Sequence, residues 1–183
     1  MDPGIHSPSR LTLITGPVRS GKTRLALEIA RSFPPPRLYL ATAQALDDEM
    51  AERIHRHRQE RGSDFQTIEE PLQISHRLQE FQDPYSVIVV DCLTLWLSNV
   101  LGAGGEGLEF QEIMGGLTGV LRNRSIPLIL ISNEVGWGIV PENTLARTFR
   151  DLSGRLNQSI AQIADRVILM VAGLPLVMKG NRG

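Results

Sequence analysis

Short apolar runs alternate with longer amphipathic segments along most of this chain. Residues 86–91 (SVIVVD) and 127–132 (PLILIS) are almost continuously apolar. Continuous rather than alternating apolar character is typical of strands that are buried on both faces in a parallel sheet. Comparable runs predict further strands at residues 11–15, 37–41, 65–68 and 166–171.

Between these runs, apolar residues recur at the spacing of a helix. The longest such segment covers residues 143–164, with apolar positions three and four residues apart: Leu145, Phe149, Leu152, Leu156, Ile160 and Ile163. The same pattern predicts helices at residues 24–31, 47–59, 72–81 and 108–122, the last interrupted at Gly115 and Gly116. Alternating strands and helices predict an α/β fold with a mostly parallel central sheet. Gly173 can turn the last strand into a short antiparallel C-terminal hairpin with residues 176–178.

The length and the breaks in the chain favour one folded unit. At 183 residues the chain can bury a substantial core, and no linker or repeat divides it. We expect a single domain over residues 11–183. Residues 1–10 contain two prolines and no apolar core of a signal peptide, which predicts a flexible leader.

Composition and charge exclude several classes of protein. The chain is 42% hydrophobic and 21% charged with a formal net charge of −1, so neither nucleic acid nor an anionic membrane is an expected partner. No apolar run is long enough to span a bilayer. Cys92 is the single cysteine, so no disulfide can form within the chain, which suits the cytoplasm.

The first predicted strand leads into a glycine loop that predicts nucleotide binding. Residues 16–23 read Gly-x-x-x-x-Gly-Lys-Thr, between a strand and a helix: Gly16, Pro17, Val18, Arg19, Ser20, Gly21, Lys22 and Thr23. The two glycines let successive N–H groups curl around a phosphate. Lys22 adds a mobile positive charge, and the Thr23 hydroxyl can bind Mg²⁺. A tight glycine turn without a ligand would leave Lys22 and Thr23 unexplained. The expected class is a three-layer P-loop NTPase-like (RecA-like) fold.

Other candidates follow the carboxyl ends of the predicted strands, where ligands bind in open α/β sheets. Ala41, Thr42 and Ala43 end the second strand, and Asp91 ends the run at residues 86–91. An aspartate in this place fits the second carboxylate that organises Mg²⁺ in P-loop enzymes. The alternative is that Asp91 caps the helical segment 93–101.

The predicted helix at residues 47–59 carries a candidate nucleophile. On a helical projection, His57 shares a stripe with Met50 and Ile54, whereas His55 points away from it. His57 should therefore face the protein, with Arg61 near it. One interpretation is that His57 lies in the core with a hydrogen-bond partner. The other is a neutral imidazole that attacks phosphorus.

The long connection NEVGWGIVPEN, residues 133–143, leaves a strand at the same predicted edge. Its position favours binding of a second substrate, with Glu134 and Trp137 as the candidates. An ordinary strand-to-helix connection is the alternative. Arg147, Arg150 and Arg155 follow on the long helix, where solvated charges are the default expectation.

Three blocks together carry a family resemblance: residues 16–23 (GPVRSGKT), 41–61 (ATAQALDDEMAERIHRHRQER) and 133–158 (NEVGWGIVPENTLARTFRDLSGRLNQ). The chain resembles the bifunctional adenosylcobinamide kinase / adenosylcobinamide-phosphate guanylyltransferase family over nearly its whole length after residue 10. The resemblance implies phosphorylation of adenosylcobinamide, followed by transfer of GMP from GTP through a GMP-histidine. It also implies ATP and GTP as substrates, Mg²⁺, and a homotrimer.

The resemblance also implies individual roles. The Arg-Ile-x-x-His pattern of the family falls on residues 53–57 and selects His57 as the nucleophile. Arg58, Gln59, Glu60, Arg61 and Glu69 look like the guanine-nucleotide contacts, and Asp91 like the metal or substrate carboxylate. The loop departs from a common Gly-Gly-Ala-Arg-Ser form at Pro17 and Val18, and Pro17 has no N–H to offer a phosphate. Other hypotheses are a P-loop kinase without nucleotidyl transfer and a RecA-like nucleotide-gated binding module.

Overall fold

In the part of the chain that the structure describes, seven strands form one sheet in the order β3-β2-β4-β5-β1-β6-β7, in which only the last pair is antiparallel. The computed structural model describes residues 9–45, 48, 51–52, 58–59, 62–81, 83–105 and 107–180. The strands are β1 (Leu11–Thr15), β2 (Leu38–Ala41), β3 (Gln66–Glu69), β4 (Ile88–Asp91), β5 (Leu128–Ile131), β6 (Arg166–Val171) and β7 (Leu174–Lys179). The mostly parallel sheet and the antiparallel C-terminal hairpin confirm the predicted topology.

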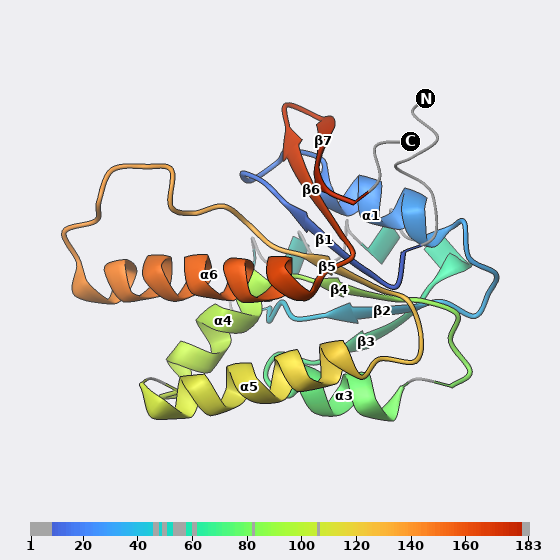
Figure 1. Cartoon of the computed structure of the whole chain (residues 1–183), viewed down its shortest axis with the longest axis horizontal. Helices are drawn as coiled ribbons and strands as arrows, with labels where there is room; N and C mark the ends of the chain where they lie inside the picture. The colour runs from blue at the N-terminus through green and yellow to red at the C-terminus, as the bar shows by residue number, and fades with distance from the viewer. Residues whose placement is uncertain are drawn as a thin grey trace.

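Helices cover both faces of the sheet, which gives three layers (Figure 1). On one face lie α3 (Ile74–Glu80), α4 (Leu93–Gly102), α5 (Leu108–Arg122) and α6 (Thr144–Ile163), whose apolar sides share a core with alternate strand residues. On the other face, α1 (Lys22–Ala30) packs Leu25, Ala26 and Ile29 against the remaining strand residues. A short 3₁₀ turn, Gly62–Asp64, precedes β3.

Several boundaries differ from those that the sequence predicts. The helix α5 runs without interruption through Gly115 and Gly116, so the predicted break is wrong. A Cβ at either glycine would meet no atom within 4 Å, which shows that neither is required by close packing. The hairpin strand β7 is longer than predicted. Most of the predicted helix 47–59 and the first eight residues of the predicted leader 1–10 lie outside the described residues, although Asp48, Ala51, Glu52, Arg58 and Gln59 are helical.

Glu70 anchors the start of α3 directly after β3. One carboxylate oxygen accepts hydrogen bonds from the N–H groups of Leu72 and Gln73 at 3.1 and 2.9 Å, and the other accepts from Arg77 Nε at 3.1 Å. Burial acts to raise the pKa of Glu70, but these hydrogen bonds and the Arg77 charge outweigh it and lower the pKa from 4.5. The contact fixes the end of β3, and with it Glu69, at the edge of the sheet.

We expect Glu70→Ala to lower the free energy of unfolding by about 1 kcal/mol at neutral pH, because two N–H groups at the helix start lose their acceptor. The folded pKa lies below the unfolded value of 4.5, so this stability is present above pH 4.5 and is lost as the pH falls through the folded pKa. Urea unfolding at pH 7 and pH 3 measures both effects. Glu80→Ala, which breaks only the exposed pairs with Arg77 and His76, is the control and should cost less. An equal cost for Glu70→Ala at both pH values would contradict the prediction.

Candidate nucleotide site at the carboxyl edge of the sheet

Four parallel strands end level with one another and bring their carboxyl ends to one edge. Asp91 at the end of β4 is in register with Ala41 of β2 and with Ile131 of β5, which in turn is in register with Ile14 of β1. The residues that follow these strands therefore meet in space. This is the edge at which open α/β sheets bind their ligands.

The glycine loop at residues 16–21 has the shape of a phosphate cradle. Gly16 and Gly21 have φ values of 143° and 92°, which favour glycine. A Cβ at Gly16 would lie 2.4 Å from the carbonyl oxygen of Met170, so β6 leaves room there for a hydrogen atom alone. Residues 18 and 19 are exposed at the tip of the loop, Pro17 is half-buried, and Ser20 is buried beneath it. The loop leads directly into α1, whose first N–H groups and dipole attract anions.

Lys22, at the start of α1, is held inside this loop. Its side chain is buried, and Nζ donates to the carbonyl oxygens of Gly16 and Pro17 at 3.0 and 2.6 Å. The cation is thus kept within the loop by the loop's own backbone. Pro17 contributes its carbonyl group to Lys22, although it has no N–H for a phosphate.

A hydroxyl and a carboxylate meet beside the loop in the way expected for a magnesium site. Thr23 Oγ1 donates to Asp91 Oδ2 at 2.7 Å, and the Tyr39 hydroxyl donates to the same oxygen at 2.6 Å. Hard oxygen ligands of this kind, completed by phosphate oxygens and water, are those that Mg²⁺ prefers in P-loop enzymes. The alternative role for Asp91 is wrong, because the residue that caps α4 is Cys92, whose Sγ accepts from the Leu95 N–H.

Thr42 and Cys92 close the floor of the site between β2 and β4. Thr42 is fully buried; its hydroxyl donates to the Cys92 carbonyl at 2.7 Å and accepts from the Cys92 N–H at 2.8 Å. Burial raises the pKa of the Cys92 thiol to about 12, and the charge of Asp91 adds to the shift. The thiol therefore stays protonated and is no nucleophile. Ala41 and Ala43, by contrast, are partly accessible at this edge.

The predicted guanine contacts are described only in part. Arg58 and Glu69 form an exposed ion pair with 2.5 Å between Nη2 and Oε1, so these two candidates do lie together. Gln59 is helical and exposed. His57, Glu60 and Arg61 lie outside the described residues.

The connection at residues 133–143 begins against the glycine loop. The Glu134 N–H donates to the Gly16 carbonyl at 3.2 Å, and Glu134 Oε1 accepts from Thr15 Oγ1 at 2.7 Å and from Asn157 Nδ2 at 3.0 Å. Glu134 thus lies against the glycine loop. Trp137 lies further along the connection and is exposed, with no hydrogen bond or ring contact to the described part of the chain.

Buried polar side chains join this connection to the sheet. Ser132 Oγ donates to Asn157 Oδ1 at 2.6 Å, Asn157 Nδ2 donates to the Asn133 carbonyl at 3.1 Å, and Thr94 Oγ1 accepts from the Asn133 N–H at 2.8 Å. We call the hydroxyl, amide and carboxylate groups at these strand ends the carboxyl-edge network: Thr15, Thr42, Thr94, Ser132, Glu134 and Asn157. The sequence analysis missed all of its members except Thr42 and Glu134. A polar Asn157 beside the apolar stripe of α6 was the available signal.

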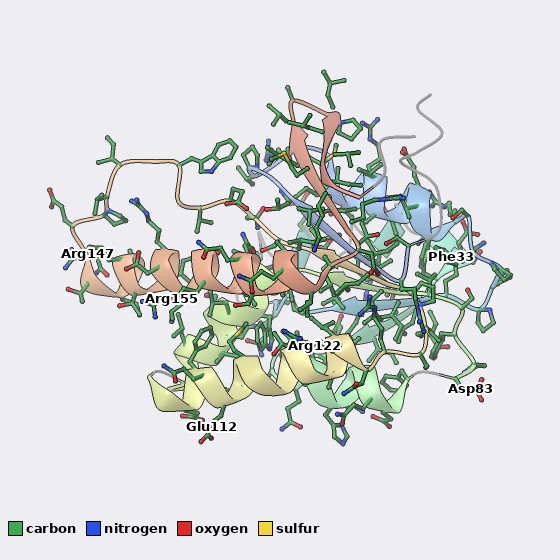
Figure 2. The ribbon with its side chains drawn as sticks, in the orientation of Figure 1. Phe33, Asp83, Glu112, Arg122, Arg147 and Arg155 are labelled. Carbon is green, nitrogen blue, oxygen red and sulfur yellow. The ribbon has the colours of Figure 1, made fainter. Side chains whose placement is uncertain are left out.

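Two arginines of α6 also depart from expectation. Arg147 donates to the carbonyl groups of Pro141 and Glu142 at 3.0 and 2.5 Å, and thereby fastens the end of the connection to the helix. Arg150 is half-buried, with a fully buried Nη1. The expectation of solvated charges is therefore wrong for these two and correct for the exposed Arg155 (Figure 2).

The fold, the glycine loop and the Thr23–Asp91 pair define a P-loop nucleotide-binding protein. Solved structures with similar folds include a type III secretion system ATPase (TM-score 0.56, 14% identity, 92% of this chain and 57% of that one). They also include a KaiC-like protein from Pyrococcus horikoshii (TM-score 0.53, 14% identity, 95% of this chain and 81% of that one). At this identity they support the RecA-like fold alone.

Sequence relatives are more specific. The family model described as cobinamide kinase / cobinamide phosphate guanyltransferase matches residues 12–178. A bifunctional adenosylcobalamin biosynthesis protein of Pseudomonas aeruginosa is 42% identical, with 92% of this chain and 97% of the relative covered. Its counterpart in Salmonella typhimurium is 38% identical, with 92% and 99% covered. The chain belongs to the cobinamide kinase / cobinamide phosphate guanyltransferase family, which confirms the resemblance. Within the described residues, no helix is both long and apolar enough to cross a bilayer.

Tyr39 gives a direct test of the metal site, because its hydroxyl donates to the oxygen of Asp91 that also bonds Thr23. We expect Tyr39→Phe to raise the Mg²⁺ concentration needed for half-maximal nucleotide binding about threefold to tenfold, the effect of one hydrogen bond. Titration of nucleotide binding against Mg²⁺ measures this. Tyr85→Phe, a buried tyrosine on the loop before β4, is the control and should leave the Mg²⁺ dependence unchanged. An unchanged dependence in Tyr39→Phe would contradict the assignment of Asp91.

Proposed function

We propose that this protein phosphorylates adenosylcobinamide and then transfers GMP from GTP to adenosylcobinamide phosphate, through a GMP-histidine on His57. Family membership over residues 12–178 carries the proposal, because that range contains the glycine loop, the Arg-Ile-x-x-His pattern and the connection after β5. The Thr23–Asp91 pair beside the loop supports use of a nucleotide with Mg²⁺. We further propose a cytoplasmic homotrimer, as the resemblance implies.

In the kinase step the acceptor hydroxyl attacks the γ-phosphorus of the triphosphate. A P–O bond to the acceptor forms, the bond from the γ-phosphorus to the bridging oxygen breaks, and the hydroxyl proton is lost to solvent or a nearby base. Catalysis of this kind is mainly positioning and charge neutralisation. The backbone of residues 16–21 and Lys22 would hold the triphosphate, and Thr23 and Asp91 would hold Mg²⁺, which neutralises phosphate charge when bound.

In the guanylyl step a lone pair of neutral His57 attacks the α-phosphorus of GTP. The N–P bond forms, the bond from the α-phosphorus to the bridging oxygen breaks, and pyrophosphate departs with that electron pair. An ionised oxygen of adenosylcobinamide phosphate then attacks the same phosphorus. The P–N bond breaks and its electron pair returns to the imidazole, which leaves as the neutral ring because its other nitrogen carries a proton. The product is adenosylcobinamide-GDP.

The assignment of His57 predicts which activity a substitution removes. We expect His57→Ala to form no labelled protein adduct with GTP labelled at the α-phosphate, and to retain phosphorylation of adenosylcobinamide, because only the guanylyl step uses the imidazole. The measurement combines acid-labile, alkali-stable protein labelling with a kinase assay. His55→Ala is the matched control, since a helical projection predicts that His55 points away from the stripe of His57, and it should label like the unsubstituted protein. Labelling that persists in His57→Ala would show that another residue is the nucleophile. Kinase activity without any adduct in the unsubstituted protein would indicate a single-function kinase.

A further inference from the structure

A buried pair of donors lies on α6 beneath the connection at residues 133–143. Ser153 is 1% exposed, and Arg150 is half-buried with its Nη1 atom fully buried. Neither Arg150 Nη1 nor Ser153 Oγ has a hydrogen-bond partner among the residues that the structure describes. Because the two residues are three apart, they lie on the same face of the helix. Asn157, one turn further on, donates a hydrogen bond to Glu134, so this face of α6 is directed toward the connection.

The charge of Arg150 makes the missing partner significant. A guanidinium carries five donors and stays protonated, and burying such a group without an acceptor is costly. The ion pairs of the described residues include none with Arg150. Arg147, one turn earlier, does have acceptors in the carbonyl groups of residues 141 and 142. On this side of α6, the connection thus supplies hydrogen-bond acceptors to Arg147, but neither the connection nor any other described residue supplies one to Nη1 of Arg150.

The connection passes over Arg150 with little side-chain bulk. It runs from β5 alongside α6 to the start of that helix (Figure 1). A Cβ at Gly136 would lie 4.0 Å from Arg150 Nε, which places the backbone of Gly136 beside the guanidinium with no side chain between them. A second glycine, Gly138, follows, and a Cβ there would meet no atom within 4 Å. Arg150 is thus covered by the backbone of the connection rather than by another side chain.

The position of the pair separates it from the nucleotide's phosphates. Seven residues of helix put Arg150 about 10 Å along the axis of α6 from Asn157, which contacts Glu134 at the glycine loop. The loop and Lys22 already serve the triphosphate. A guanidinium with a neighbouring hydroxyl matches the oxygens of a second, separate phosphate group.

We propose that Arg150 and Ser153 bind the phosphate monoester of the acceptor in the guanylyl step. This inference rests on the proposed function, in which adenosylcobinamide phosphate carries such a group and adenosylcobinamide does not. Arg150 would hold the acceptor phosphate while one of its ionised oxygens attacks the α-phosphorus, the P–N bond breaks and the electron pair returns to the imidazole. The guanidinium would offset the repulsion between the two phosphate groups. The pair is therefore a specificity determinant that distinguishes the phosphorylated from the unphosphorylated corrinoid.

Calorimetric binding of the two corrinoids to the full chain tests this without any turnover. The unsubstituted protein should bind adenosylcobinamide phosphate more tightly than adenosylcobinamide. In Arg150→Gln the Kd for the phosphate form should rise about 10-fold to 100-fold, the range for a charge-assisted hydrogen bond, and the Kd for adenosylcobinamide should not change. Ser153→Ala should raise the Kd for adenosylcobinamide phosphate about threefold and leave the Kd for adenosylcobinamide unchanged. Arg155→Gln, on the exposed side of the same helix, is the matched control and should change neither.

Kinetics add a second readout. In Arg150→Gln the KM for adenosylcobinamide phosphate should rise in parallel with its Kd, while protein labelling by GTP and the KM for adenosylcobinamide stay within about twofold of the unsubstituted values. Arg150→Lys keeps the charge but loses the forked geometry of the guanidinium. Its KM for adenosylcobinamide phosphate should therefore lie between those of Arg150→Gln and the unsubstituted protein.

Several results would overturn the inference. One is an equal Kd for the phosphate form in Arg150→Gln and the unsubstituted protein; another is an equal loss for both corrinoids, which would indicate a role in folding. A change of oligomeric state in Arg150→Gln on sedimentation would assign Arg150 to a contact between subunits instead. If the unsubstituted protein binds both corrinoids but forms no adduct with GTP, the proposed function fails while the binding comparison still decides the role of Arg150.

Discussion

The candidate site depends on buried hydrogen bonds between polar side chains at the carboxyl ends of the parallel strands. The carboxyl-edge network joins β2 to β4 through Thr42, and β5 to α6 and β1 through Ser132, Asn157 and Glu134. Buried hydrogen bonds of this kind are costly when incomplete, so they fix the relative positions of the strand ends. The glycine loop, Asp91 and the connection after β5 all start from that fixed floor. Their geometry is therefore set by the sheet more than by their own sequences.

The sequence predicts the part of this arrangement that depends on local pattern. Continuous apolar runs identify the buried strands, and the Gly-x-x-x-x-Gly-Lys-Thr pattern identifies the phosphate loop, because both signals are contained in a few neighbouring residues. The partners of Asp91 and Glu134 could not be predicted in this way. Tyr39 and Thr23 are far from Asp91 in sequence, as Thr15 and Asn157 are from Glu134, and only the strand order brings them together. In the sequence, Arg147 and Arg150 look like solvated helix charges, because nothing in the local pattern shows that the connection lies against them.

Glu134 links the two halves of the candidate site. Its backbone N–H bonds the glycine loop, and its carboxylate bonds both the end of β1 and the helix that carries Arg150. A nucleotide in the loop and an acceptor under the connection would thus share one rigid element rather than lie in separate pockets. In the proposed two steps, the triphosphate that is attacked at its γ-phosphorus and the GTP that is attacked at its α-phosphorus would each bind in the same loop, while the attacking group changes.

The close contact between Gly16 and the Met170 carbonyl has a consequence for synthesis of the chain on the ribosome. The strand that leads into the glycine loop is made before both of its sheet neighbours, β5 and β6. Since strand β1 has no sheet partner until residues 128–131 and 166–169 have emerged, the nucleotide loop cannot take its final shape before then. The nascent chain therefore acquires nucleotide binding only well after the motif responsible for it has been translated.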